Sequence, residues 1–369
     1  MSVAMLFDMR PKVGRHDLYG REAELASMLA ALESATPLIL LLGQRRIGKT
    51  SLLKTSLAEA RRPYIYLDMR RLDEEGYSKV VLYRLLSEEM TRLNSTWKKL
   101  GEALKRVKGV QVAGTGIELD WSRTGLLLSS LFNSLDRWAE GNKVVVAIDE
   151  AQLLGNMIGG KGKIDFRSLI AYCYDNLRHV KFLLTGSEVG LLLDFVGADD
   201  PRNPLYGRGR EEITLERFTR EKSIGYLTAG FLECGAKADP NMFERATEKL
   251  DGIVGWLTLY GNLATSQEWS SGAMALESVM GSAKGMARSE LESVFRRSKY
   301  YRMSLKSMGM GRTRWKDIKT DVSSWMGRPA TDSQMARTLA TLTKLSIVER
   351  KGEGYLIADP VIAEYAGGL

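Results

Sequence analysis

The sequence predicts an α/β protein with a parallel sheet at its core, followed by a helical region and a C-terminal winged-helix domain. A continuous apolar run at 37–42 has the length of a strand and lacks the alternation of a half-exposed strand, and further strand-length runs lie at 63–68, 143–148 and 180–185. Helical patterns separate these runs, as in a parallel sheet with helices on both faces. After Leu215 no strand pattern appears until two short ones near the C-terminus.

The first 215 residues alternate between helical and extended patterns. An irregular start leads into a helix with apolar residues at helical spacing from Leu25 to Leu32. The next predicted elements are a strand at 37–42, a helix at 50–60, a strand at 63–68, helices to about 106, a hairpin at 110–119, a helix at 126–139, a strand at 143–148, a helix at 164–177 and a strand at 180–185.

The remainder of the chain is mainly helical. We expect helices at 219–234, 240–250, 257–267, 291–308, 315–326 and 331–345, then strands at 347–350 and 355–357. Three helices followed by a hairpin are typical of a winged helix-turn-helix. The predicted division is therefore a core at 1–215, a small helical domain at 216–283 and a winged helix at 284–369.

Composition excludes several classes of protein. Of 369 residues, 44% are hydrophobic and 27% charged, so the chain can bury a core and is not a disordered protein. It contains no apolar run long enough for a transmembrane helix, and its first residues do not resemble a signal peptide. Two cysteines, Cys173 and Cys234, and two histidines argue against a disulfide framework or a structural zinc site. We therefore expect a cytoplasmic protein without a membrane partner.

The net charge of +8 is unevenly distributed. Residues 284–351 contain sixteen Lys and Arg against six Asp and Glu, so the rest of the chain has a slight negative charge. A basic segment attached to a near-neutral body favours a polyanionic partner, although the same pattern fits an ordinary solvated surface.

The most specific motif lies directly after the first predicted strand. It is the complete GxxxxGK[ST] loop of 43–50, in which backbone N–H groups surround phosphates and the lysine reaches the β- and γ-oxygens. The helix that follows directs its positive end at the same phosphates. The predicted nucleotide ligands are Gly43, Gln44, Arg45, Arg46, Ile47, Gly48, Lys49, Thr50 and Ser51.

A second motif ends the strand at 143–148. Asp149 follows this buried strand directly, where it can hold Mg²⁺ together with the Thr50 hydroxyl, and Glu150 can orient the attacking water. Ligands bind at the carboxyl ends of strands in such sheets, so both motifs are expected at one edge.

Three further residues are candidates for catalysis. Ser187 follows the strand at 180–185 and can contact the γ-phosphate or the water, or simply cap a turn. Arg208 and Arg210 lie just past the core, and either can act as an arginine finger, in cis or on a neighbouring subunit, or belong to a surface loop.

Competing classes of P-loop protein fit less well. Residues 142–145 begin like the guanine-reading Asn-Lys-x-Asp motif but lack its aspartate, which disfavours GTP. A small-molecule kinase would lack the acidic pair at Asp149 and Glu150 and would not need a winged helix.

The order of short motifs along the chain is informative: YGRE at 19–22, the P-loop, DEAQ at 149–152, LLTGS at 183–187, PLYGR at 204–208 and GWLTLYG at 255–261. In this order the chain resembles the archaeal ATPase family, a member of the AAA+-related STAND group of P-loop NTPases. The resemblance implies an AAA+-like core, a helical lid and a winged helix. It implies ATP and Mg²⁺ as ligands, Asp149 and Glu150 as the Walker B pair, and Ser187 near the sensor position.

The same resemblance places Tyr19, Gly20 and Arg21 beside the adenine. One turn of the lid departs from the family pattern: Asp251 stands for a glycine and Val254 for a proline. This departure puts the contact between lid and nucleotide in doubt.

The predicted winged helix offers side chains suited to DNA. The candidates are Arg312, Arg314, Lys316, Lys319, Gln334, Arg337, Lys344, Arg350 and Lys351, of which Gln334 and Arg337 are of the type that reads base edges. Winged helices also dock proteins.

The sequence thus predicts a Mg²⁺-dependent ATPase, expected to be slow, that couples ATP to conformational change and to duplex DNA. The alternatives are a slow-turnover regulatory switch of the STAND type that acts on a protein partner, and a DNA-binding initiator or loader resembling origin-recognition ATPases. The expected partners besides ATP and DNA are a second copy of the chain or another protein.

Overall fold

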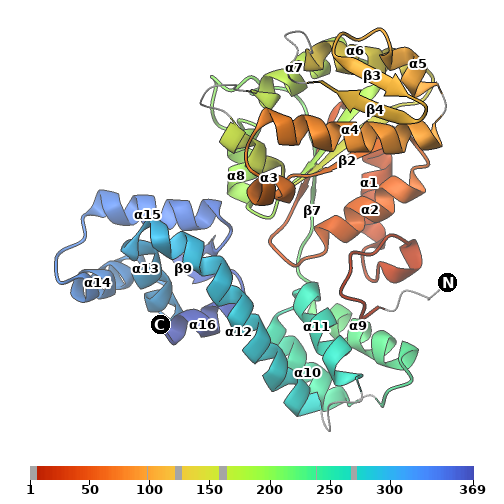
Figure 1. Ribbon diagram of the computed structural model, residues 1–369. Helices are drawn as coiled ribbons and strands as arrows, with labels where there is room; N and C mark the ends of the chain where they lie inside the picture. The colour runs from red at the N-terminus through yellow and green to blue at the C-terminus, as the bar shows by residue number, and fades with distance from the viewer. Residues whose placement is uncertain (1–5, 98, 121–126, 158–163, 238, 267–271) are drawn as a thin grey trace. The chain divides into compact units, whose positions relative to one another are not determined.

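The computed structural model describes residues 6–97, 99–120, 127–157, 164–237, 239–266 and 272–369. The chain forms two compact units (Figure 1). The sheet unit contains residues 21–43 and 49–215, and the C-terminal unit contains the chain up to Gly20, residues 44–48 and residues 216–369. The middle of the P-loop therefore groups with the C-terminal unit, whereas both ends of the loop group with the sheet.

The sheet unit is built on five parallel strands, as expected for this fold class. In spatial order they are β2 (Tyr64–Asp68), β5 (Val144–Asp149), β6 (Val180–Thr185), β1 (Leu38–Leu42) and β7 (Glu211–Thr214). The sequence analysis did not predict β7, because two glutamates in its four residues hide the apolar pattern. β7 is an edge strand, where such charges are tolerated.

Helices surround this sheet. They are α1 (Glu22–Glu33), α2 (Lys49–Glu59), α3 (Arg70–Glu75), α4 (Lys79–Thr96), α5 (Leu100–Leu104), α6 (Leu128–Trp138), the 3₁₀ helix η2 (Ala151–Met157), α7 (Phe166–Asn176) and α8 (Val189–Phe195). The predicted hairpin is present as β3 (Val110–Ala113) and β4 (Gly116–Leu119). The expected start of a helix at 126 lies outside the described residues.

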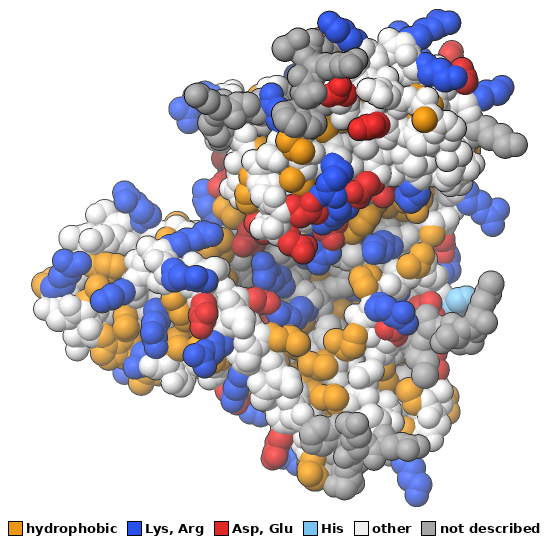
Figure 2. Space-filling model, viewed as in Figure 1, with side chains coloured by type: hydrophobic (Ala, Val, Ile, Leu, Met, Phe, Trp, Pro, Cys, Tyr) orange, Lys and Arg blue, Asp and Glu red, His pale blue; other side chains and the backbone are white. Residues whose placement is uncertain are grey.

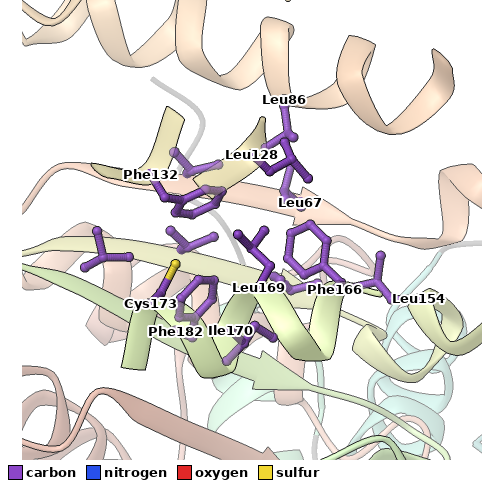
Figure 3. Close-up of a cluster of buried hydrophobic side chains, with 14 of the residues drawn as sticks. Leu67, Leu86, Leu128, Phe132, Leu154, Phe166, Leu169, Ile170, Cys173 and Phe182 are labelled. Carbon is purple, nitrogen blue, oxygen red and sulfur yellow. The ribbon is translucent and has the colours of Figure 1, made fainter. Parts of the chain in front are cut away.

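A large hydrophobic core joins the sheet to several of its helices, among them α4, α6 and α7. Phe182 of β6 stacks on Phe132 of α6 with ring centroids 5.7 Å apart, and Phe166 and Ile170 of α7 belong to the same buried cluster (Figure 3). Every residue of β5 and β6 is buried, Asp149 and Lys181 included, which explains why these strands are mainly apolar.

The C-terminal unit is mainly helical. Its elements are η1 (Arg15–Asp17), α9 (Arg220–Glu233), α10 (Pro240–Leu250), α11 (Val254–Ala264), α12 (Gly272–Arg297), α13 (Lys299–Gly309), α14 (Trp315–Met326), α15 (Asp332–Lys344), β8 (Val348–Lys351), β9 (Gly354–Ile357) and α16 (Pro360–Gly367). Phe7 is wedged between α9 and α11, where Gly230 and Gly261 leave room for its ring.

Two sequence expectations fail in this unit. The helix expected at 291–308 is divided between the end of α12, a helix of 26 residues, and α13, and the three glycines of α12 obscured its apolar pattern. The final helix α16 was not predicted, although Asp359 caps it and Pro360 occupies its first turn, a recognisable helix start. The predicted helix end at 267 lies outside the described residues.

Within the described residues, no helix combines the length and the apolar character needed to cross a lipid bilayer.

Candidate nucleotide site

The P-loop connects β1 to α2. Lys49 is the first residue of α2, and its buried Nζ donates a hydrogen bond of 2.7 Å to the carbonyl oxygen of Gly43. Gly43 and Gly48 have φ angles of 148° and 97°, which glycine adopts without strain. The loop therefore closes around a concave backbone at the N-terminus of α2, a geometry suited to phosphate.

Asp149 is the last residue of β5 and is almost fully buried. Its Oδ2 accepts hydrogen bonds from the Thr50 hydroxyl at 3.0 Å and from the Tyr66 hydroxyl at 3.1 Å. Burial, followed by the charge of Glu150, raises the pKa of Asp149, and the Thr50 hydrogen bond opposes that rise. The sequence analysis missed Tyr66, because nothing in a single strand shows which neighbouring strand will lie beside it.

Thr50 and Asp149 are oxygen donors of the kind that Mg²⁺ prefers, and the two side chains already touch. Among the described residues, no three His, Cys, Asp or Glu side chains form a ready-made metal cluster. The pair fits a metal that takes the rest of its ligands from phosphate oxygens and water, as in other P-loop proteins.

Glu150 follows Asp149 and has a φ of 55°, an uncommon left-handed conformation for a residue with a side chain. Its Oε2 accepts hydrogen bonds from the backbone N–H and the hydroxyl of Ser187, both at 2.9 Å. Gln152 Nε2 donates to the same oxygen at 2.7 Å. The structure thus brings Ser187, at the end of β6, against Glu150, at the end of β5.

The two arginines proposed as fingers lie elsewhere in the sheet unit. Arg210 directly precedes β7, whose register pairs Glu211 with Ile39 near the start of β1, and it is ion-paired to Glu212. It is therefore level with the amino ends of the strands, opposite the P-loop edge. Arg208 pairs with Asp175 near the end of α7, which leads into the start of β6, and this pairing raises the pKa of Arg208. Neither arginine joins the cluster at Asp149.

Comparison with known proteins fits this geometry. Residues 18–259 match the model of a family described as an ATPase domain predominantly from Archaea. The chain belongs to this archaeal ATPase family. A Walker-type ATPase of Pyrococcus abyssi has a similar structure at 35% identity, with a TM-score of 0.83 over 98% of this chain and 99% of that one. The Aeropyrum pernix ORC2 protein, solved as ADPNP–ADP complexes, shares the fold at 14% identity and a TM-score of 0.64, over 98% and 96% of the two chains. No curated protein matches the sequence.

The residues expected beside the adenine of this archaeal ATPase divide between its two units. Tyr19 packs against the rings of Phe218 and Tyr226, and Lys222 donates a hydrogen bond to the carbonyl oxygen of Gly20, all within the C-terminal unit. Arg21 belongs to the sheet unit, where its buried side chain pairs with Glu24.

The middle of the P-loop makes specific contacts within the C-terminal unit. Arg46 adopts a left-handed conformation with a φ of 63°, and its carbonyl oxygen accepts the Gly255 N–H at 2.9 Å. A Cβ on Gly255 would lie 2.8 Å from Arg46 Cβ, so the close approach requires glycine. The turn at 251–256 therefore contacts the P-loop at Arg46, although Asp251 and Val254 depart from the family pattern.

The Arg46 side chain extends this contact to two more helices. Its guanidinium lies 4.2 Å above the Trp256 ring and pairs with Glu290 of α12. Asp359, the N-cap of α16, lies 3.9 Å from Arg46 and accepts the Trp256 indole N–H at 3.0 Å. Burial raises the pKa of Asp359, against the lowering effect of these donors. The Arg45 guanidinium lies 3.5 Å from the carboxylate of Glu290. The side chain of Ile47 is buried.

The candidate DNA-binding side chains are mostly exposed. Figure 2 shows Lys and Arg side chains spread over the surface of the C-terminal helices, with few acidic groups among them. The exposed members are Arg312, Arg314, Lys316, Gln334, Arg337, Lys344, Arg350 and Lys351.

Several members of this set have partners within the protein. Arg312 lies 3.6 Å from the carboxylate of Asp321. Lys319 is ion-paired to Asp332. Gln334 forms a capping box with Thr331: its Oε1 accepts the Thr331 N–H at 3.1 Å, and its own N–H reaches the Thr331 hydroxyl. The spacing Thr-x-x-Gln at 331–334 was a signal for this cap, and the prediction of a base-reading glutamine overlooked it.

Proposed function

We propose that this archaeal ATPase hydrolyses ATP in a Mg²⁺-dependent reaction and uses the nucleotide to control a DNA-binding C-terminal unit. One observation carries the proposal. A single loop supplies Lys49 and Thr50 at the carboxyl edge of the sheet and Arg46 to the packing of α11, α12 and α16. A change in the loop on phosphate binding would alter both sets of contacts.

The chemistry follows from the residues at the strand ends. Lys49 Nζ leaves the Gly43 carbonyl for the β- and γ-oxygens of ATP, where its charge favours the transition state. Thr50 and Asp149 would hold Mg²⁺, which would neutralise charge on the phosphates. Tyr66 keeps Asp149 directed toward Thr50. Glu150 orients the water that attacks the γ-phosphoryl group in line with the leaving ADP oxygen, and Ser187 holds Glu150 in place.

Turnover is expected to be slow for a free molecule. Arg208 and Arg210 lie away from the Asp149 edge within the chain, so an arginine finger would have to come from a second copy of the protein or from a partner. A homo-oligomer is therefore part of the proposal. Both cysteines are free thiols, which is the usual state in the cytoplasm, where we place the protein.

The DNA-binding role is supported by the C-terminal architecture and charge. Three helices, α13 to α15, precede the β8–β9 hairpin, and a β-bridge joins Arg314 to Gly354 of the hairpin, as in a winged helix. We propose that α15 enters the major groove with Arg337 facing the bases and that Arg350 and Lys351 contact backbone phosphates.

In this proposal residues 1–215 bind nucleotide, although residues up to Gly20 and 44–48 group with the C-terminal unit. Residues 216–283 then respond to the nucleotide, and 284–369 bind DNA. The second candidate function is a regulatory switch that retains ADP and acts on a protein partner. The Arg46 contacts support the regulatory switch as well as the DNA-binding function, because both require the C-terminal unit to respond to the position of the P-loop.

Single-turnover hydrolysis with bound nucleotide measured in parallel tests the chemistry. The wild-type protein should convert ATP to ADP, Lys49→Ala should bind neither, and Glu150→Gln should retain ATP. If Lys49→Ala converted ATP to ADP at the wild-type rate, the proposed function would be contradicted. Tightly retained ADP that exchanges only with a protein partner, together with no affinity for duplex DNA, would favour the switch.

A further inference from the structure

We propose that Gln152 is a positioning residue for hydrolysis. Residue 186 must then be glycine, because the Gln152 side chain occupies the space that a side chain at position 186 would need. Gln152 lies in η2 and is only 8% exposed. It is placed to hold the carboxylate of Glu150 and has no expected contact with nucleotide. The inference rests on the proposed hydrolysis of ATP.

The first step of the argument is the convergence of donors on one oxygen. Gln152 Nε2 at 2.7 Å, and the N–H and hydroxyl of Ser187 at 2.9 Å, all donate to Oε2 of Glu150. Three donors on one atom fix the rotation of the carboxylate. They leave Oε1 as the oxygen that can accept a hydrogen bond from the attacking water.

The second step is the backbone of Glu150. Its φ of 55° is a conformation that persists in a non-glycine residue only where surrounding contacts determine it. The direction of the side chain is therefore set by these hydrogen bonds together with the end of β5. Loss of one donor should let the carboxylate rotate away from the water position.

The third step is the packing of Gln152 itself. A Cβ at Gly186 would lie 2.3 Å from Gln152 Oε1 and 3.2 Å from its Cδ. The φ of Gly186 is outside the left-handed region, so glycine is needed here for space and not for backbone freedom. Gln152 Oε1 is buried and has no hydrogen-bond partner among the described residues, so the bond donated to Glu150 is the hydrogen bond that orients the amide there.

These contacts predict a specific pattern in a double-mutant cycle. Gly186→Ala should push the Gln152 amide off Glu150 and lower kcat about tenfold or more, the order expected when a catalytic group is misplaced by about an ångström. Gln152→Ala should lower kcat to a similar extent. In the Gln152→Ala background, Gly186→Ala should cause no further loss, because the group that it strikes is gone.

Two further readouts separate positioning from structural damage. Gln152→Met keeps the packing but removes the donor, and it should lower kcat like Gln152→Ala while KM and nucleotide affinity stay within about twofold of wild type. Wild-type kcat in Gln152→Met, or independent effects of the two substitutions in the cycle, would overturn the inference.

The steric half of the inference can be measured without nucleotide. Gly186→Ala should lower the Tm of the wild-type protein and have little effect on the Tm of Gln152→Ala. An equal drop in both backgrounds would overturn it. The Tm comparison does not depend on ATP. If the wild-type protein showed no Lys49-dependent turnover, the proposed function would be contradicted, but the Tm values would still test the contact between Gln152 and Gly186.

Discussion

The two units hold their polar side chains in different ways. In the sheet unit, Asp149 and Ser187 are buried and belong to hydrogen-bonded groups at the ends of β5 and β6. In the C-terminal unit, the cations of α14, α15 and the hairpin are mostly exposed to solvent. Buried hydrogen bonds are little affected by salt, whereas exposed charges are screened. Buried, hydrogen-bonded side chains suit catalysis, which needs groups at fixed positions. Exposed cations suit the binding of a long polyanion such as DNA.

The P-loop takes part in both arrangements. Its ends, Gly43 and Lys49, close on each other in the sheet unit, and Arg46 between them is held by Trp256 and Glu290. The contrast teaches that the loop proposed to bind phosphate is also a structural contact of the C-terminal unit. Substitution of Lys49 should therefore affect ATP hydrolysis itself, whereas substitution of Arg46 should affect the coupling of hydrolysis to the C-terminal unit.

The largest effect is expected for Lys49→Ala, which removes nucleotide binding and catalysis and leaves the Arg46 contacts in place. Loss of the ammonium removes a charged donor to the β- and γ-oxygens, and kcat/KM should fall by about 10³-fold or more. Steady-state phosphate release measures it. Lys105→Ala, at an exposed position paired to Glu102, is the matched control and should keep wild-type turnover.

Glu150→Gln should have the next largest effect. Without the carboxylate that orients the water, kcat should fall by about 10²-fold to 10³-fold, while ATP remains bound. Filter binding of labelled ATP beside turnover separates the two quantities. A variant that loses ATP affinity in proportion to its rate would show that Glu150 serves binding and not the chemical step.

Arg337→Ala tests whether the exposed cations of the C-terminal unit bind DNA. If α15 contacts DNA, the affinity should fall about tenfold at moderate salt, as for the loss of one base contact. Fluorescence anisotropy with a labelled duplex measures this change. Gln334→Ala is the contrasting variant: it should leave the dependence of affinity on salt unchanged and cost about 1 kcal/mol of unfolding free energy, because Gln334 belongs to the capping box.

The smallest effect concerns the stability of the nucleotide-free protein. The raised pKa of Asp149 means that the folded protein keeps a proton there at pH values where the unfolded chain has lost it. Stability from this group is thus present at low pH and is lost as pH rises above the ordinary aspartate value of about 3.9. Asp149→Asn should therefore raise the unfolding free energy at pH 7 by about 1 kcal/mol. Urea unfolding with a chelator present measures it, and a destabilised variant would contradict the account.

Sequence reasoning found the parts of the site that local order determines. A buried run ending at Gly43 or at Asp149 places these residues at a strand end whatever the rest of the fold does. Tyr66 escaped prediction because its contact with Asp149 depends on the pairing of β2 with β5. Gln152 was within a recognised motif, but its bond to Glu150 depends on an uncommon backbone turn.

The fold was predictable to a similar degree. The strands β1, β2, β5 and β6 follow from apolar runs, and the hairpin β3–β4 follows from alternation around glycines. The edge strand β7 carries too few apolar residues to be seen. The grouping of residues 44–48 with the C-terminal unit could not be predicted, because it depends on contacts of Arg46 with residues more than 200 positions away.

The central claim is that the phosphate site and the C-terminal unit are coupled through the P-loop. The most direct measurement is steady-state ATP hydrolysis with and without saturating duplex DNA, in the wild-type protein, Lys49→Ala and Arg46→Ala. We predict Lys49-dependent turnover that rises several-fold with DNA in the wild type and responds to DNA much less in Arg46→Ala. Lys49-dependent turnover that is indifferent to bound DNA, or the same stimulation in Arg46→Ala, would contradict the coupling.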